Sequence, residues 1–297
     1  MTQQILEPIE INGMRVKNRL GFAPFLNMPH GPGSAPDEQT IRWFEERAKS
    51  GLGFILTGAF SPRDSGIPGA GLGIWSDDQI EPLARVSEAV HRHGAKLGVQ
   101  LAAGGPMTGT SPSPGPFPDA EHATIGPQVA IHGIDVPVRA LNREEILAIE
   151  DDFAAAAARI KAAGVDAVEL HCAHGGATLH CSFISPYYNH RKDEYGGSWE
   201  NRLRFPLETV LKMRDAVGPD FPIFVRLSAD QLVGPRGIQL ADTTQHIVPA
   251  LEAASVDCFD VSQGDILRAP EGILISMYYR RGCFIHLAEA VKKVTSR

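Results

Sequence analysis

Four polar side chains stand at or just past the ends of short apolar runs, where they could act on a small molecule. Gln100 lies in GVQL, and Arg226 interrupts IFVRL. His171 and His174 follow the run VEL. In barrels of alternating strands and helices, the carboxyl ends of the strands carry the chemistry. The four positions therefore predict a binding site that combines two imidazoles, one amide and one guanidinium.

Arg226 and Gln100 each allow a binding and a structural interpretation. A buried arginine without a partner is costly, so Arg226 either binds an anion or electron-rich ligand or forms an internal salt bridge. Gln100 could hydrogen-bond the edge of a heterocycle through its carbonyl and its amide. It could equally be a satisfied amide of the core.

His171 and His174 form an H-x-x-H pair whose imidazoles can converge on one oxygen if the chain turns into a short helix there. A structural pair of histidines is one alternative. A metal site is another, because His180, Cys172 and Cys181 are nearby. Neither an H-E-x-x-H nor a CxxC frame supports zinc, so we expect no metal.

The segments that hold these residues alternate between short apolar runs and longer stretches of helical spacing. This alternation indicates βα repeats and a parallel sheet. The continuous apolar character of the runs predicts burial on both faces of the sheet. The six expected strands are Arg19–Phe25, Leu52–Ala59, Ala95–Leu101, Val165–His171, Phe221–Leu227 and Val256–Ser262.

Several helices are expected between and after these strands. Asn142 can cap one of them, with Glu145 three residues on, and others begin at about Trp199 and cover about Phe284–Val294. The Pro- and Gly-rich region Gly104–Pro137 predicts a loop excursion over the mouth of a barrel. A disordered insert without a role is the alternative.

Length and composition predict one large domain with a substantial core. The chain has 297 residues, of which 43% are hydrophobic and 21% charged, and a net charge of -7. A chain with this net negative charge has no positive electrostatic field that would attract nucleic acid or anionic lipid, so we expect a small-molecule substrate. Without an apolar signal region, a membrane-spanning run or a disulfide framework, we expect a cytoplasmic protein.

Long stretches of the sequence resemble, in order, the Old Yellow Enzyme family of NADH:flavin oxidoreductases. They are VKNRLGFAPF, WFEERAKSGLGFILTGA, GVQL, AAGVDAVELHCAHG, SPYYNHRKDEYGGSWENRLRF and VRLS, and they span about Pro8 to Lys293. The closing YYRRGCFIHLAEAVKK is similar to the branch that contains dienoyl-CoA reductase and trimethylamine dehydrogenase. The resemblance implies an α/β fold, a TIM (β/α)8 barrel that binds FMN and is reduced by NADH or NADPH.

The resemblance also implies which residues bind the flavin. Gln100 would bind the pyrimidine edge, and Arg226 would face the N1 and O2 side, where reduction places negative charge. Elsewhere the backbone would lie against the ring. The implied flavin-binding residues are Ala23, Pro24, Phe25, Ala59, Gln100 and Arg226.

For the reaction, the resemblance implies that His171 and His174 bind the carbonyl oxygen of an α,β-unsaturated substrate. They would stabilise the developing enolate while hydride arrives from flavin N5. Gly176 stands where the family commonly has a tyrosine that delivers the proton. The remaining candidate proton donors are Tyr187, Tyr188, His180 and water.

Six strands and a terminal helix fall short of a closed eight-stranded ring. The last two strands and the final helix of the barrel are therefore expected to be absent from this chain. Phosphate in such barrels commonly lies on the loops after strands seven and eight, so we expect weak FMN retention. A homo-oligomer or a completing partner chain would cover the open sheet edges.

Three functions stay open on the sequence. The first is an FMN-dependent ene-reductase. The second is a catalytically silent fragment or pseudoenzyme that needs a partner chain to complete the FMN site. The third is a barrel lyase or isomerase that uses the two histidines without flavin.

Overall fold

The computed structural model describes residues 2–25, 29–64, 71–104, 112–113, 139–266 and 268–297. The predicted loop excursion Gly104–Pro137 falls almost entirely outside the described residues. Within the described part of the chain, no helix combines the length and apolar character needed to cross a bilayer.

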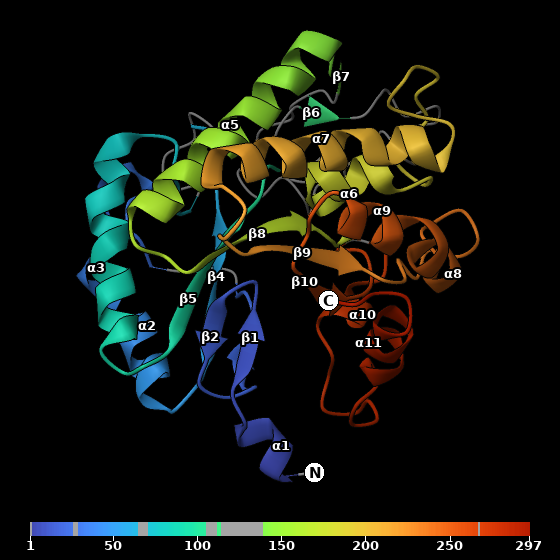
Figure 1. Ribbon diagram of the computed structural model, residues 1–297. Coiled ribbons are helices and arrows are strands. Elements are labelled where there is room, and N and C mark those ends of the chain that lie inside the picture. Colours follow the sequence, from blue (N-terminus) through green and yellow to red (C-terminus); the bar gives the residue numbers. More distant parts are fainter. Residues whose placement is uncertain (1, 26–28, 65–70, 105–111, 114–138, 267) are drawn as a thin grey trace. The chain divides into compact units, whose positions relative to one another are not determined.

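Six strands form one sheet in the order β10-β9-β8-β5-β4-β3 (Figure 1). The pairings of β3 with β4, β4 with β5 and β5 with β8 are parallel, as the alternation of strands and helices predicts. Each of the six predicted strands is present. They are β3 (Gly21–Phe22), β4 (Phe54–Phe60), β5 (Lys96–Leu101), β8 (Ala167–Cys172), β9 (Ile223–Ser228) and β10 (Cys258–Ser262).

The prediction that the strands are buried on both faces is confirmed for the middle of the sheet and wrong at its ends. Every residue of β8 is buried, and β5 and β9 each have a single half-buried residue. In β10 the first four residues are only half-buried, and β3 is much shorter than the predicted Arg19–Phe25. Both strands end the sheet order, so in the described sheet each lacks a neighbour on one side.

The chain divides into two compact units, each assembled from several segments. Many of the elements named below belong wholly to one unit, whereas β8, β9 and two long helices contribute to both. The first unit contains Met1–Ala102, Asp151–Leu170 and Lys212–Phe224, and the second contains Ala103–Glu150, His171–Leu211 and Val225–Arg297.

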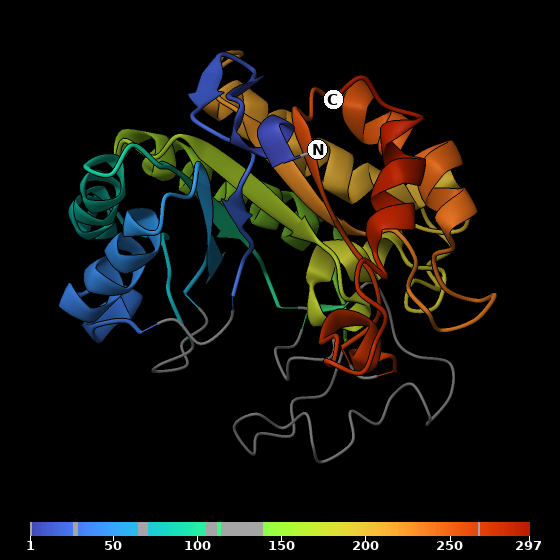
Figure 2. The same cartoon turned by 90° about the horizontal axis from the view of Figure 1, so that it is seen from below.

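The first unit begins with elements that the sequence did not predict, a short helix α1 (Thr2–Leu6) and an antiparallel hairpin of β1 (Ile9–Ile11) and β2 (Met14–Val16). Helices α2 (Glu38–Lys49) and α3 (Ile80–His91) lie side by side in Figures 1 and 2. They pack on β4 and β5, so that the apolar side chains between them form the core of this unit.

Two glycines allow the strands of the first unit to pack closely. A Cβ atom on Gly53, just before β4, would lie 2.4 Å from the carbonyl oxygen of Asn18. A Cβ atom on Gly98, inside β5, would lie 2.7 Å from the ring of Phe54. Neither position therefore has room for a side chain.

The long helices α5 (Arg143–Ala162) and α7 (Trp199–Val217) begin where the sequence predicts. At the start of α5, Asn142 Oδ1 accepts a hydrogen bond of 2.9 Å from the Glu145 backbone, and the Asn142 backbone donates one of 2.9 Å to Glu145 Oε2. This reciprocal pair is the predicted capping box. Gly164 follows the helix with φ of 71°, a conformation that glycine adopts without strain.

The segment before α7 is dense in charged residues, contains a Gly-Gly pair and is held by its own hydrogen bonds. Asn189 donates from its amide to the carbonyls of Phe183 and Tyr195, at 2.6 and 2.7 Å. Arg202 donates to the carbonyl of Asn189 at 2.5 Å, and Arg191 pairs with Asp193 at 2.5 Å. The segment is thus a rigid element of the second unit.

The second unit also contains the predicted terminal helix, α11 (Ile285–Lys292), which packs against the strand ends. Leu287 and Val291 of α11 share an apolar cluster with Leu227, Ala229 and Val248. The other helices and strands of this unit are short. They are β6 (Pro112–Ser113), β7 (Arg139–Ala140), α6 (Leu179–Ile184), α8 (Leu240–Asp242), a π-helical turn (Thr243–Ile247), α9 (Val248–Ala253) and α10 (Pro270–Ile273).

Candidate functional site

In the first unit, two predicted site residues and a third residue, Glu169, form a row across neighbouring strands. Ala59 of β4 pairs with Gln100 of β5, and Gln100 pairs with Glu169 of β8. Gln100 and Glu169 are buried and Ala59 is half-buried. The strand register therefore places a backbone position, an amide and a carboxylate side by side.

The side chain of Gln100 is oriented by Glu169. Its Nε2 donates a 2.7 Å hydrogen bond to Glu169 Oε1, while its backbone N–H donates to Thr57 Oγ1 at 3.2 Å. An amide has two N–H donors and one carbonyl acceptor, so this bond uses one donor and fixes which way the amide points. The sequence prediction missed Glu169 because the residue lies inside an apolar run and its role depends on the pairing of β8 with β5.

The segment after β3 brings Ala23, Pro24 and Phe25 to the surface of the first unit. Ala23 and Phe25 are exposed, and Pro24 is half-buried. The Phe25 ring stacks on Trp43 of α2, with centroids 6.4 Å apart and an interplanar angle of 19°. Because this side chain is engaged with α2, the backbone is the part of the segment that can lie against a ligand.

In the second unit, His171 and His174 lie close together. Their ring centroids are 5.0 Å apart and their planes are nearly perpendicular, at 87°. The predicted short helix is present as a single 3-10 turn, Gly175–Ala177, that begins directly after His174. His171 is buried and His174 is half-buried, so the pair borders a region from which most water is excluded.

Both imidazoles are neutral at physiological pH. Burial, followed by the nearby His174 and Arg226, lowers the pKa of His171 well below its ordinary value of 6.5. Burial, followed by Arg226, lowers the pKa of His174 from 6.5 to about 3. The backbone N–H of Ala173 donates to His171 Nδ1 at 3.3 Å, so the proton of this neutral ring is on Nε2. His171 is thus a hydrogen-bond donor through Nε2–H.

Two serines, each the last residue of its strand, hold His174 in position. Its backbone N–H donates to Ser228 Oγ at 2.8 Å, and its Nε2 lies 3.0 Å from Ser262 Oγ. Ser228 in turn donates to the carbonyl of Gly264 at 3.1 Å. His174 itself has φ of 71°, in the left-handed region that non-glycine residues seldom adopt. The position of the ring therefore depends on these contacts.

Arg226 of β9 forms an internal salt bridge, which is one of the two roles that the sequence allows for it. Its Nη1 lies 3.3 Å from Asp260 Oδ2 of β10. Burial raises the pKa of Asp260, against the opposing effect of Arg226. The Nε atom of Arg226 is nevertheless buried without a hydrogen-bond partner among the described residues. The ion pair thus leaves part of the guanidinium unsatisfied.

A buried carboxylate, Asp265, organises the turn around His174, and the sequence prediction missed it. Asp265 Oδ2 accepts hydrogen bonds from Tyr188 at 2.8 Å and from Gln231 at 3.0 Å. A Cβ atom on Gly175 would lie 1.7 Å from the same oxygen, so this position must be glycine. Asp265 follows the end of β10, so the rule that chemistry lies past strand ends could have found it.

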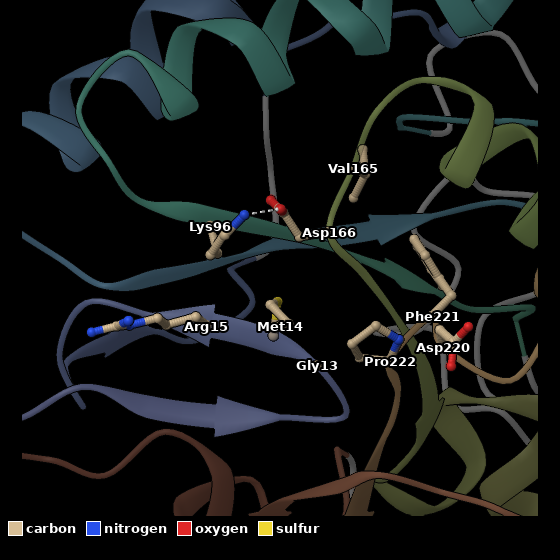
Figure 3. Close-up of a pocket in the computed structure, with 9 residues that line it drawn as sticks. All are labelled: Gly13, Met14, Arg15, Lys96, Val165, Asp166, Asp220, Phe221 and Pro222. Atoms are coloured by element: carbon tan, nitrogen blue, oxygen red, sulfur yellow. Dashed lines mark hydrogen bonds and ion pairs between the residues drawn. The ribbon is translucent and has the colours of Figure 1, made fainter.

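A shallow hollow of about 420 Å³ lies elsewhere in the first unit (Figure 3). Lys96 begins β5, and Asp166 and Pro222 immediately precede β8 and β9. Lys96 Nζ donates to Asp166 Oδ1 at 2.6 Å across the rim. The hollow is thus at the amino ends of the strands, whereas Ala59 and Gln100 lie toward the carboxyl ends, so it is not the predicted site.

Residues 4–277 match the model of the NADH:flavin oxidoreductase / NADH oxidase family. The chain belongs to this family. FMN is the cofactor of this class of oxidoreductase, and NADH or NADPH is its reductant.

Individual relatives agree with the assignment. The chain is 34% identical to an NADPH dehydrogenase of Bacillus velezensis over 276 residues, which cover 91% of this chain and 76% of that protein. It is 30% identical to a cinnamate reductase of Clostridium sporogenes over 321 residues, which cover 98% of this chain but 45% of the relative. The chain thus spans less than half the length of the larger relative.

A solved structure supports the same fold. The old yellow enzyme homologue from Zymomonas mobilis superposes with a TM-score of 0.74 at 25% identity, covering 98% of this chain and 79% of that one. The predicted α/β class and barrel type are therefore confirmed, and the chain contains part of the barrel of such enzymes.

The residues of this NADH:flavin oxidoreductase fit a flavin in their chemistry. Arg226 Nε lacks a hydrogen-bond partner among the described residues, and a flavin ring offers nitrogen and oxygen acceptors. Among the described residues, the Gln100 side chain bonds through one N–H, to Glu169, and its second N–H and its carbonyl match the donor and acceptor edge of a pyrimidine ring.

The candidate proton donors differ in their surroundings. Burial, followed by Asp265, raises the pKa of Tyr188, whose hydroxyl donates to that carboxylate. His180 is buried, stacks on Phe205 at 4.3 Å and lies 3.0 Å from Thr209 Oγ1, and burial lowers its pKa to about 3. Neither group carries a proton that it can readily give up at neutral pH.

The metal alternative for the histidine pair gains no support in the described part of the chain. No group of three or more His, Cys, Asp or Glu side chains arranged to hold a metal ion occurs there. Cys181 instead accepts a 3.2 Å hydrogen bond from the backbone of Gly175, and burial raises the pKa of its thiol to about 12.

Proposed function

We propose that the chain reduces activated alkenes, with an α,β-unsaturated carbonyl compound as substrate and FMN as cofactor. The supporting observation is the pair of neutral imidazoles, His171 and His174, whose ring centroids are 5.0 Å apart. Two neutral rings can both donate to one carbonyl oxygen and remain donors over a wide pH range. The similarity to a cinnamate reductase agrees with this choice of substrate class.

FMN, when bound, takes up a hydride from NADH or NADPH and delivers it to the alkene. Arg226 holds a fixed positive charge that stabilises the negative charge of the reduced ring. Gln100 binds the ring edge with the N–H and carbonyl that Glu169 leaves available. The remaining contacts are made by the backbone. The residues proposed for the flavin are Ala23, Pro24, Phe25, Ala59, Gln100 and Arg226.

His171 and His174 act on the substrate by stabilising charge. As the β-carbon gains hydride, negative charge develops on the carbonyl oxygen, and each N–H donor stabilises it by roughly 1.5–3 kcal/mol. The α-carbon then takes its proton from Tyr187 or from water. Tyr188 and His180 are less suited because Tyr188 donates to Asp265 and His180 is buried against Phe205.

Anaerobic half-reactions test this function. The protein is purified with FMN, reduced by NADPH or NADH while the flavin absorbance is followed, and then mixed with enones, unsaturated thioesters or amines. We expect reoxidation by the unsaturated carbonyl compounds, and we expect His174→Ala to slow this step about a hundredfold or more while the protein still binds FMN.

Two results would contradict the proposal. If the flavin is reduced but none of the unsaturated carbonyl compounds reoxidises it, the substrate class is wrong. If the protein does not bind FMN at all, the chain is catalytically silent as it stands. Glu88→Gln, a change on α3 in the first unit, is a suitable control for handling and folding.

A further inference from the structure

The His174 ring packs against the His171 ring and, among the described residues, makes one side-chain hydrogen bond. Its Nε2 lies 3.0 Å from Ser262 Oγ, and Ser262 is 5% exposed. The backbone on either side is also held, because the His174 N–H donates to Ser228 at 2.8 Å and the Ile266 N–H donates to the His174 carbonyl at 3.4 Å. Nε2 is therefore occupied by the protein, and Nδ1 is the nitrogen left for a ligand.

The tautomer of His174 follows from what the site must do. The ring is neutral, so only one of its nitrogens carries a proton. If Ser262 accepts from Nε2–H, then Nδ1 presents a lone pair that repels a substrate oxygen. If Ser262 donates to Nε2, then Nδ1–H is a donor.

We propose that Ser262 is a positioning residue that donates its hydroxyl proton to His174 Nε2 and so fixes the Nδ1–H tautomer. The inference rests on the proposed function, in which both imidazoles donate to the carbonyl oxygen of the substrate. The same arrangement holds His171, because the backbone N–H of Ala173 donates to Nδ1 at 3.3 Å and leaves Nε2–H as the donor. In both rings a protein donor satisfies the acceptor nitrogen.

The direct test is nitrogen NMR of the protein labelled with ¹⁵N-histidine, because the two tautomers differ in which nitrogen is protonated. The His174 signals are identified by their loss in His174→Asn. We expect a protonated Nδ1 in the wild-type protein and a mixture of tautomers in Ser262→Ala. Ser262→Thr, which keeps a hydroxyl, should restore the wild-type pattern.

A matched control separates the proposed role from a general loss of packing. Ser87 is also a buried serine with one hydrogen bond, a donation of 2.7 Å to the carbonyl of Gly164, and it lies on α3 in the first unit. Ser87→Ala should leave the His174 tautomer unchanged. A protonated Nε2 in the wild-type protein, or an unchanged Nδ1–H tautomer in Ser262→Ala, would overturn the inference.

Kinetics provides a second readout. Ser262→Ala should slow flavin reoxidation by an unsaturated carbonyl compound roughly tenfold, with recovery in Ser262→Thr. If no such compound reoxidises the flavin of the wild-type protein, the proposed function fails while the NMR result still decides the tautomer. If reoxidation occurs and Ser262→Ala leaves its rate unchanged, the positioning role fails.

Discussion

Acidification from pH 8 to pH 5 is expected to destabilise the folded protein through its buried histidines. Burial lowers the pKa of His174 and of His180 from 6.5 to about 3. Because the pKa is lower in the folded protein than in the unfolded chain, the unfolded chain binds protons first as the pH falls. The contribution of these histidines to the free energy of unfolding is therefore fully present above about pH 6.5 and is lost as the pH drops toward 3. At pH 5 each histidine removes about 2 kcal/mol from the free energy of unfolding, or about 4 kcal/mol together.

The assay is urea unfolding at several pH values between 5 and 8, followed by circular dichroism. His180→Gln removes one of the buried histidines with a lowered pKa and keeps a polar side chain near Thr209 and Phe205. We expect this variant to lose about 2 kcal/mol less than the wild-type protein between pH 8 and pH 5. The comparison uses the change with pH, so any constant loss of packing cancels.

The control is His286→Gln, since His286 is exposed on α11. Its free energy of unfolding should follow the wild-type pH dependence. If His180→Gln also follows the wild-type curve, His180 takes up its proton equally well in the folded and unfolded states. The argument from burial would then be refuted.

Three further predictions concern a helix cap and the proposed flavin contacts. Asn142→Ala should cost about 1 kcal/mol and lower Tm by about 2 °C, because the capping box of α5 is lost, and an unchanged melting curve would contradict this. Arg226→Gln should weaken FMN binding about tenfold or more in a fluorescence titration and make the flavin harder to reduce. Arg226→Lys should lose less FMN affinity and leave the flavin easier to reduce than Arg226→Gln does. Equal effects of the two substitutions would show that the positive charge is not the cause. Glu169→Gln should weaken FMN binding about threefold because the Gln100 amide loses its fixed direction, and unaltered affinity would refute this role.

The order of strands and helices could be predicted because burial produces patterns that the sequence shows directly. The run Ala167–Cys172 is apolar at four of its six positions and forms a buried strand, and the Asn142 cap is visible from its spacing to Glu145. The hairpin Ile9–Val16 was missed because its two strands are short and their pairing depends on the turn between them.

The candidate site could be predicted only in part. His171, His174, Gln100 and Arg226 stand out because polar residues are rare at the ends of apolar runs. Two neighbouring carboxylates are harder to recognise, because Glu169 pairs with Gln100 only through strand register and Asp265 reaches the turn around His174 only through loop folding. The hydrogen bond between His174 and Ser262 joins residues that lie far apart in sequence, so no local sequence pattern predicts it.

The left-handed backbone of His174 limits which residues can replace it during evolution. With φ of 71°, most side chains at this position would be strained, whereas asparagine tolerates the conformation and glycine adopts it freely. Asparagine also carries an amide N–H donor, whereas glycine has no side chain with which to bind a substrate oxygen. We therefore expect exchange between histidine and asparagine to be the least disruptive route by which this position diverges among related enzymes.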